Sequence, residues 1–446
     1  MRLTLTAIAL VLMFAGDAAA ATRSVARLSE RPDYAIAGDA AVILQTSRRG
    51  ARVVRVPFDP TAGRSIVFRF RAPDGLATAD LAASADLLAV GVVSEERDSL
   101  ETTGQEFTGP PLGPLTAFGP PRNTRGNAFL PVFHEVDGDR LITTETRGVT
   151  TWRWVIHEQG APAHTIQPPR DADGSDIAGD LVALLRGDEL VVRNWRTGAR
   201  LATHRIHGEL FSLDLRADGA IVVGLEGGDI VAYMPGAPPR RIARHSGLPT
   251  FAGDRIVFVR QFRKTGYARL QVRDPNGRVR PIGVPSATTA TFEVDEHRVL
   301  WQANGCLLTA PLAEPSARAP EPGVCPRSEM ALPDEVSRPV GSDRRVLIRA
   351  DCVAAAPPAC RGTLTVRGVF GRGLSERQRF RIPVGRRGRL KVRLTRRGYA
   401  AVKRMDRQIG GAGVEVRTVS VDPDGRRRVQ LHRYIVDVPP QGVRSY

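Results

Sequence analysis

A short pattern of residues recurs along this chain and constrains its fold more than any other feature. In one copy, FAGDRIVF at residues 251–258, a Gly-Asp turn joins two apolar runs. Similar units lie at residues 36–43, 83–90, 136–143, 177–184, 216–223 and 294–301, which makes seven copies. Aligned on Asp39, Asp86, Asp139, Asp180, Gly219, Asp254 and His297, they are separated by 47, 53, 41, 39, 35 and 43 residues. Repeats of this length are typical of four-stranded propeller blades.

The sixth copy shows how one blade is built. Residues 249–252 are predicted to form an inner strand and residues 256–259 a second strand that is continuously apolar. A strand without alternation is buried on both faces, as in a blade packed between two neighbours. A third strand at 270–272 and an outer strand at 278–282 flank the turn DPNG. We therefore expect an all-β fold that contains a seven-bladed β-propeller.

The repeat also resembles a known family. AGDRIVFV followed by LQVRDPNG is similar to the repeat of bacterial β-propellers of the TolB-associated, WD-like type, over roughly residues 33–320. The family's Ser-Pro-Asp-Gly turn is absent, and the nearest match is Ala217-Asp218-Gly219. The resemblance implies a scaffold used for protein or ligand binding and less often for catalysis, a choice that the fold alone does not make.

The two ends of the repeat region suggest how the ring closes. The seventh copy stops after residues 306–312 and therefore provides three strands, so residues 23–29 are expected to supply the fourth. Pairing the start of the chain with its last blade would remove an exposed sheet edge.

The N-terminus and the cysteines both indicate export. Residues 1–21 read as a signal peptide cut after Ala20 or Ala21, no later segment is apolar enough to span a membrane, and we expect a secreted or envelope-associated monomer. Disulfides persist in that environment. The four cysteines allow three pairings, of which proximity favours Cys306 with Cys325 and Cys352 with Cys360. No C-x2-C spacing supports a zinc site.

A second domain follows the repeats. We assign residues 22–325 to the propeller, 326–340 to a Pro-rich linker and 341–446 to a basic immunoglobulin-like β-sandwich. Its predicted strands are 345–350, 361–368, 377–382, 388–394, 413–421 and 427–437, and its predicted helix is 395–408.

The charge of the chain lies in this second domain. Residues 336–446 contain 26 Arg and Lys and 8 Asp and Glu, a net charge of +18, which leaves −1 for residues 1–335 of the chain's +17. Cations alternate with apolar residues in two predicted strands, and a hairpin with Arg381 opposite Arg389 would align them on one face. The six residues are Arg377, Arg379, Arg381, Arg389, Lys391 and Arg393.

Three interpretations of this basic face remain open. It could bind an anionic cell-envelope polymer, dock on the propeller's own carboxylates, or have no ligand and reflect an Arg-rich composition. Nucleic acid is disfavoured because the chain is exported and the hairpin lacks interleaved aromatic residues. An acidic stretch at residues 94–111, predicted to be a long exposed hairpin loop, is the internal candidate.

No catalytic or metal motif is present, and we predict no cofactor. His204 and His207 are three apart and face opposite sides of a strand, while Asp171, Asp173 and Asp176 lack the register of a calcium loop. The aromatic residues Trp152, Trp154 and Trp195 are expected to pack between blades. The sequence favours a non-catalytic binding protein. The alternative is a propeller hydrolase or lyase, which would need acidic or His residues converging on the central channel.

Overall fold

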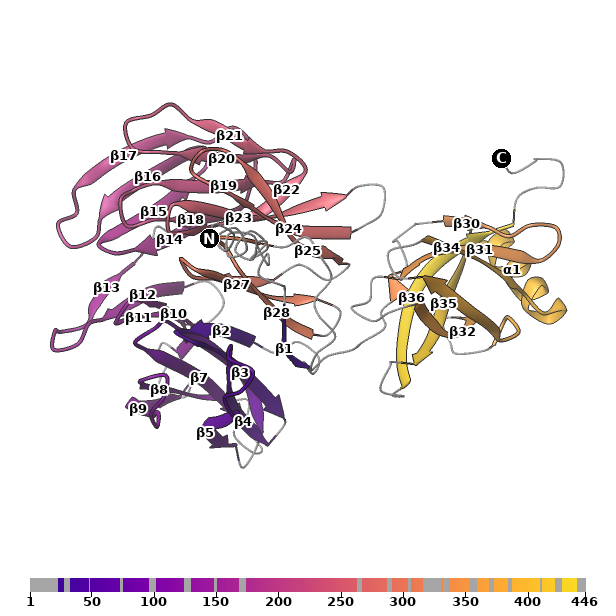
Figure 1. The fold of residues 1–446 in the computed structure, drawn as a ribbon, viewed down its shortest axis with the longest axis horizontal. Helices are drawn as coiled ribbons and strands as arrows, with labels where there is room; N and C mark the ends of the chain where they lie inside the picture. The colour runs from indigo at the N-terminus through magenta and orange to yellow at the C-terminus, as the bar shows by residue number, and fades with distance from the viewer. Residues whose placement is uncertain are drawn as a thin grey trace, which may run out of the picture.

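The computed structural model consists of a propeller and a second, smaller β unit (Figure 1). It describes residues 23–27, 33–47, 49–72, 75–95, 102–123, 130–147, 151–167, 174–262, 267–286, 291–303, 306–315, 330–331, 337–352, 359–368, 373–383, 387–409, 411–421 and 427–438. The predicted signal peptide and most of the predicted linker lie outside these residues.

Seven four-stranded antiparallel sheets form the propeller. Blade 1 contains β2 (Asp33–Ala37), β3 (Ala40–Ser47), β4 (Gly50–Pro57) and β5 (Ser65–Arg71), and blade 2 contains β6 (Leu76–Ala83), β7 (Leu88–Glu95), β8 (Thr102–Gly109) and β9 (Thr116–Asn123). Blade 3 contains β10 (Leu130–Asp137), β11 (Arg140–Arg147), β12 (Thr151–His157) and β13 (His164–Ile166), and blade 4 contains β14 (Gly174–Ala178), β15 (Leu181–Arg186), β16 (Glu189–Asn194) and β17 (Arg200–Arg205). In Figure 1 the strands of blades 1 and 4 run outward from the centre in this order.

The remaining blades include the one that closes the ring. Blade 5 contains β18 (Leu210–Leu215), β19 (Ile221–Leu225), β20 (Ile230–Tyr233) and β21 (Arg240–Ala243), and blade 6 contains β22 (Ser246–Ala252), β23 (Arg255–Phe262), β24 (Tyr267–Arg273) and β25 (Val279–Ser286). Blade 7 combines β26 (Phe292–Val294), β27 (Arg298–Ala303) and β28 (Cys306–Pro311) with β1 (Arg23–Arg27) from the start of the chain. The register pairs Arg23 with Thr309 and Arg27 with Cys306, so the predicted closure is confirmed.

A side chain reinforces this closure between blades 7 and 1. The Tyr34 hydroxyl donates a hydrogen bond to the Thr291 carbonyl oxygen at 2.8 Å. It also accepts one from the Gln302 backbone N–H at 3.0 Å. Burial raises the pKa of Tyr34 to about 12, so this hydroxyl keeps its proton and remains a donor.

Apolar side chains hold most neighbouring blades together. In the described residues, six of the seven interfaces contain a buried apolar cluster. The cluster between blades 3 and 4 includes Trp154 and Trp195 with Trp152 packed against it, which confirms that these aromatic residues lie between blades. Blades 2 and 3 share no such cluster in the described part of the chain. Their buried contact is made by charged residues, and we call it the 2–3 seam.

The second unit is made of two sheets around one core. One sheet has the order β29 (Met330–Ala331), β31 (Arg345–Cys352), β34 (Arg387–Arg393), and the other the order β30 (Ser337–Pro339), β36 (Arg427–Asp437), β35 (Ala412–Val421), β32 (Ala359–Gly368), β33 (Gln378–Pro383). Inward residues of both sheets form a single apolar cluster, to which α1 (Arg396–Ile409) adds Val402. The six predicted strands and the predicted helix are confirmed to within two residues at each end.

Two disulfide predictions concern this part of the chain. Cys352 and Cys360 form a disulfide, as predicted. Cys306 is also disulfide-bonded, and its predicted partner Cys325 lies outside the described residues.

Two sequence predictions about strands are wrong. The strand of Arg379 and Arg381 does not pair with the strand of Arg389, Lys391 and Arg393: β33 pairs with β32, and β34 pairs with β31 in the other sheet. Residues 94–111 are not one long exposed loop either, because β8 occupies Thr102–Gly109 and its Glu106 is buried. Among the described residues, no helix is long and apolar enough to cross a membrane.

Candidate functional site

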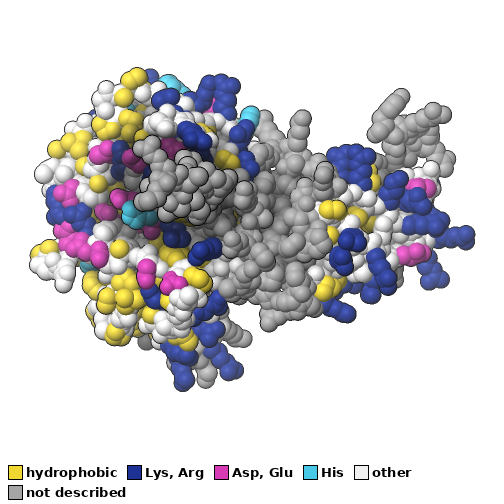
Figure 2. All heavy atoms as spheres, viewed as in Figure 1, with side chains coloured by type: hydrophobic (Ala, Val, Ile, Leu, Met, Phe, Trp, Pro, Cys, Tyr) yellow, Lys and Arg dark blue, Asp and Glu magenta, His cyan; other side chains and the backbone are white. Residues whose placement is uncertain are grey.

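The six predicted cations lie on the outer faces of both sheets of the second unit. Arg377, Arg379 and Arg381 belong to the five-stranded sheet side, and Arg389, Lys391 and Arg393 to the three-stranded sheet; all six are exposed. Because the apolar residues between them face the shared core, the two cationic faces point in opposite directions. In Figure 2, Lys and Arg side chains cover much of the visible surface of this unit, with few acidic ones.

Some of the six cations lie opposite other arginines. Arg381 lies directly opposite Arg361, and Arg393 lies opposite Arg345. A salt bridge in this unit joins Arg345 to Asp343 at 3.6 Å, but none of the six predicted cations has one with a described residue. Opposed like charges on neighbouring strands are unfavourable, so this surface is suited to binding anions.

The central channel of the propeller carries carboxylates from several inner strands. Glu135, Asp176, Asp214 and Glu293, here called the channel carboxylates, come from β10, β14, β18 and β26. Beyond the effect of burial, the negative charges of the other three lie close enough to Glu135 to raise its pKa. Blades 3, 4, 5 and 7 can meet in this way only across the centre of the ring.

Two of the channel carboxylates also link neighbouring blades. The Asp176 Oδ2 atom accepts a hydrogen bond from the Leu215 N–H at 2.6 Å. The Asp214 Oδ2 atom accepts one from the Phe251 N–H at 2.8 Å. Each hydrogen bond joins an inner strand to the next blade, so these two residues stabilise the ring.

The channel environment disfavours the charged forms of these groups. Burial within the ring raises the pKa of Asp176 and of Glu293 to about 7 each, and burial together with neighbouring carboxylates raises the pKa values of Glu135 and Asp214. Glu135 and Glu293 are exposed, but the strands around them limit the hydration of a charge at these positions.

The acidic convergence required by the enzymatic alternative is therefore present in part. The channel carboxylates supply acidic groups, but no histidine joins the four, and no three metal-ligating side chains within the described ranges lie close enough together to hold an ion. The sequence contained a signal for three of them, because Glu135, Asp176 and Glu293 each stand four residues before an aligned repeat position.

The 2–3 seam is a second cluster that the sequence did not reveal. The His134 Nδ1 atom lies 2.8 Å from Asp80 Oδ1, and its Nε2 atom lies 3.0 Å from Glu106 Oε1. Thr143 donates a hydrogen bond to the same Glu106 oxygen at 2.7 Å. His134 and Glu106 side chains are 1% and 3% exposed, so this is a buried ionic contact between two blades.

The ring of His134 fits because the facing strand has a glycine. A Cβ atom on Gly91 of β7 would lie 2.1 Å from His134 Cε1. A glycine inside an apolar strand often marks such a close approach, and this was the signal available in the sequence.

Protonation of the 2–3 seam follows from its hydrogen bonds. Burial alone would lower the pKa of His134, but the hydrogen bonds to Asp80 and Glu106 outweigh it and raise the pKa to about 9. Burial would likewise raise the pKa of Glu106, yet hydrogen bonds from His134 and Thr143 lower it. At neutral pH the seam therefore holds an imidazolium between two carboxylates.

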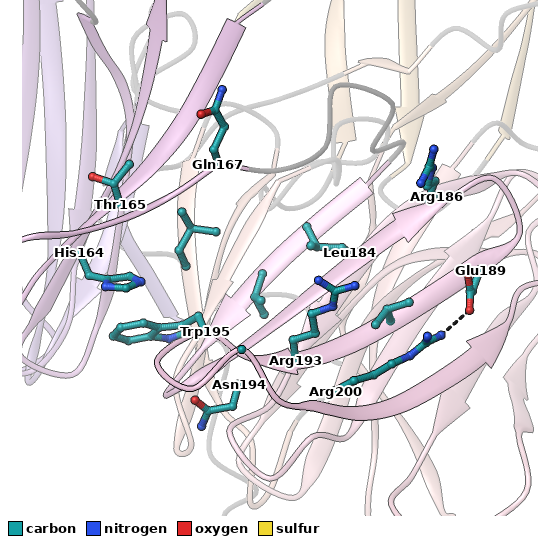
Figure 3. A pocket seen from close by; sticks show the side chains of 14 residues that line it. His164, Thr165, Gln167, Leu184, Arg186, Glu189, Arg193, Asn194, Trp195 and Arg200 are labelled. Carbon is teal, nitrogen blue, oxygen red and sulfur yellow. Dashed lines mark hydrogen bonds and ion pairs between the residues drawn. The ribbon is translucent and has the colours of Figure 1, made fainter.

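A groove of about 440 Å³ lies between blades 3 and 4 (Figure 3). It opens where β13 is only three residues long and leaves the neighbouring face of blade 4 uncovered. Val182, Leu184 and Val191 contribute aliphatic side chains to its lining, and Arg186, Arg193, Arg200 and Glu189 contribute charged ones. An acidic ligand with an apolar part matches this lining.

Comparisons with known proteins show no family for this chain. No family model matches the chain, and no curated protein matches it. The chain is similar to the β-propeller domain of the Trilobed protease from Pyrococcus furiosus, at 12% identity, covering 64% of this chain and 95% of that one with a TM-score of 0.45. It is similar to U3-55K at 11% identity, 66% and 98% coverage and a TM-score of 0.44. It is also similar to the WD40 domain of SCAP from fission yeast, at 7% identity, 61% and 81% coverage and a TM-score of 0.34.

Proposed function

We propose that this chain is an exported, non-catalytic interaction protein whose basic second unit attaches it to anionic cell-envelope material. The propeller would bind the partner, with the groove between blades 3 and 4 as its candidate surface. The TolB-associated propeller type and the immunoglobulin-like sandwich remain predictions from the sequence.

One observation carries this proposal: Arg361 and Arg381 lie opposite each other on neighbouring strands, and neither forms a salt bridge with a residue that the structure describes. A net charge of +18 over residues 336–446 adds repulsion throughout this unit. Anions bound on its surface would relieve both contributions, and attachment of this kind weakens as salt rises.

The test is retention of the full-length chain on dextran sulfate resin in a salt gradient. Replacing Arg379, Lys391 and Arg393 with Gln should move elution to lower salt, because a flexible polyanion can contact both cationic faces. The matched control replaces three exposed arginines of blade 1, Arg49, Arg69 and Arg71, with Gln. Elution of the site variant at the wild-type position, or an equal shift in the control, would contradict the proposal.

A further inference from the structure

The outer face of the five-stranded sheet differs from the other basic face because it also exposes aliphatic side chains. Along β35 and β36 the alternation turns Val414, Val416, Tyr434 and Val436 inward. The outward positions include Val421, Val429, Leu431 and Ile435, which are 45%, 49%, 56% and 43% exposed. Four of the nine exposed large hydrophobic residues in the described chain thus lie on this single face.

Val421, Val429 and Leu431 lie together with Val419 in a strip bordered by arginines, and Ile435 lies apart from them, opposite Gly413. Val419 lies opposite Val429, Arg417 opposite Leu431, and Val421 opposite Arg427. We call this surface the amphipathic face. A shallow groove of about 300 Å³ crosses it, lined by Gly362, Thr363, Arg377, Arg417, Val419, Val421, Arg427 and Val429.

The arginines of the groove are available for a ligand. Arg377, Arg417 and Arg427 make no salt bridge with any residue that the structure describes. The acidic residue Glu415 lies on the outward side of these strands, in register with Arg367 of β32. The amphipathic face therefore presents positive charge beside apolar surface.

We infer that the amphipathic face docks on an anionic lipid bilayer, with its arginines on lipid phosphates and its aliphatic strip in the interfacial region. This inference rests on the proposed function and names its partner. A wholly polar polyanion would make no favourable apolar contact with the exposed Leu431 and Val429. A bilayer combines negatively charged headgroups with an apolar interior that these side chains can contact. Exposed apolar patches rimmed by polar residues commonly mark such interaction sites.

A second copy of the chain fits this face less well than a bilayer. A two-fold interface would place the same patch against itself. The arginines around the groove would then face the arginines of the other copy, and like charges at such short range are unfavourable. Negative lipid headgroups complement them instead.

The test is co-sedimentation of the full-length chain with vesicles of phosphatidylglycerol and phosphatidylcholine, compared with phosphatidylcholine alone. We expect binding only to the anionic vesicles. Replacing Arg377, Arg417 and Arg427 with Gln should weaken binding about a hundredfold, at about fivefold for each charge. Replacing Leu431 with Ser should weaken it about fivefold, because roughly half of the side chain is already covered in the free protein.

Two matched controls separate this face from the rest of the surface. Replacing Arg49, Arg69 and Arg71 of blade 1 with Gln removes the same charge from the propeller and leaves the second unit unchanged. Replacing Leu201 of β17 with Ser changes a leucine that is 58% exposed on the propeller. Both controls should bind vesicles within about twofold of the wild type, since surface changes away from the contact have small effects.

Each outcome decides between the inference and the proposed function. Retention on dextran sulfate together with vesicle binding that Leu431→Ser does not change would overturn the bilayer inference and leave the proposed function standing. No retention on either support would overturn both. A dimer in light scattering that Leu431→Ser dissociates would assign the amphipathic face to a second copy and also overturn the inference. Equal losses of vesicle binding in the two triple variants would show that net charge alone drives binding, which would also overturn the inference.

Discussion

The buried imidazolium of the 2–3 seam makes a specific prediction about how the propeller responds to pH. Replacing His134 with Gln removes a charge that bridges two blades, since Asp80 belongs to blade 2 with Glu106 and His134 to blade 3. The variant leaves two carboxylates in a buried contact without their cation. Removing one partner of a buried ion pair costs about 3 to 5 kcal/mol, and no apolar cluster among the described residues of this interface offsets the loss.

The pH dependence can be worked out from the pKa. His134 has an ordinary value of 6.5 and a folded value of about 9, a difference that corresponds to about 3 kcal/mol. Because the folded state holds the proton more tightly than the unfolded state, the stabilisation is complete below pH 6.5. It is then lost progressively as pH rises through about 9. The free-energy gap between wild type and His134→Gln should therefore shrink by about 3 kcal/mol across this window.

Tryptophan fluorescence during urea unfolding measures this effect on the propeller alone. All four tryptophans, Trp152, Trp154, Trp195 and Trp301, lie in its blades. The matched control is His207→Gln, which makes the same chemical change at an exposed site and should behave as the wild type at every pH. A gap between wild type and His134→Gln that stays constant from pH 6.5 to beyond 9 would refute the assignment of a buried imidazolium.

Two further predictions concern the ring. Asp214→Asn should stabilise the propeller more at pH 8 than at pH 5. The pKa of Asp214 is raised in the folded state, so the folded wild type loses stability as pH rises, whereas Asn stays neutral and its amide oxygen can still accept the Phe251 N–H. Equal effects in urea unfolding at the two pH values would contradict this. Tyr34→Phe should cost about 1 kcal/mol, because the partly buried Gln302 N–H loses its acceptor. An unchanged unfolding midpoint would argue against a role for Tyr34 in closing the ring.

Local sequence patterns were sufficient to predict the repeated blades and the closure of the ring. Buried blade strands such as β23 are continuously apolar between turn residues, and that pattern depends only on neighbours along the chain. Closure by β1 followed from counting strands in the seventh repeat. The same local rule failed for β8, because the sequence TTGQEFTG has little apolar character. Its Glu106 is of a residue type that is usually exposed, yet it is buried here.

The charged contacts could not be predicted because they depend on residues far apart in the sequence. His134 meets Asp80 across 54 positions and Glu106 across 28. Nothing in the sequence near His134 shows that a neighbouring blade supplies two carboxylates. Only Gly91 hinted at a close approach on the facing strand. The channel carboxylates carried a better signal, because three of them occupy the same position of the repeat.

The observed strand pairing in the second unit differs from the predicted hairpin, and this difference determines what the basic surface can bind. Alternation along a strand decides which side a residue faces, so Arg379 and Lys391 point outward whichever strand lies beside them. It does not decide which strand is the neighbour, and the six cations are split between opposite faces instead of forming one hairpin. A single six-cation strip would suit a linear polyanion. Among the described residues, the large hydrophobic side chains that are most exposed in this unit, such as Leu431 and Val429, lie on one of these two faces. This difference gives the unit a preferred side toward a surface that is both anionic and apolar.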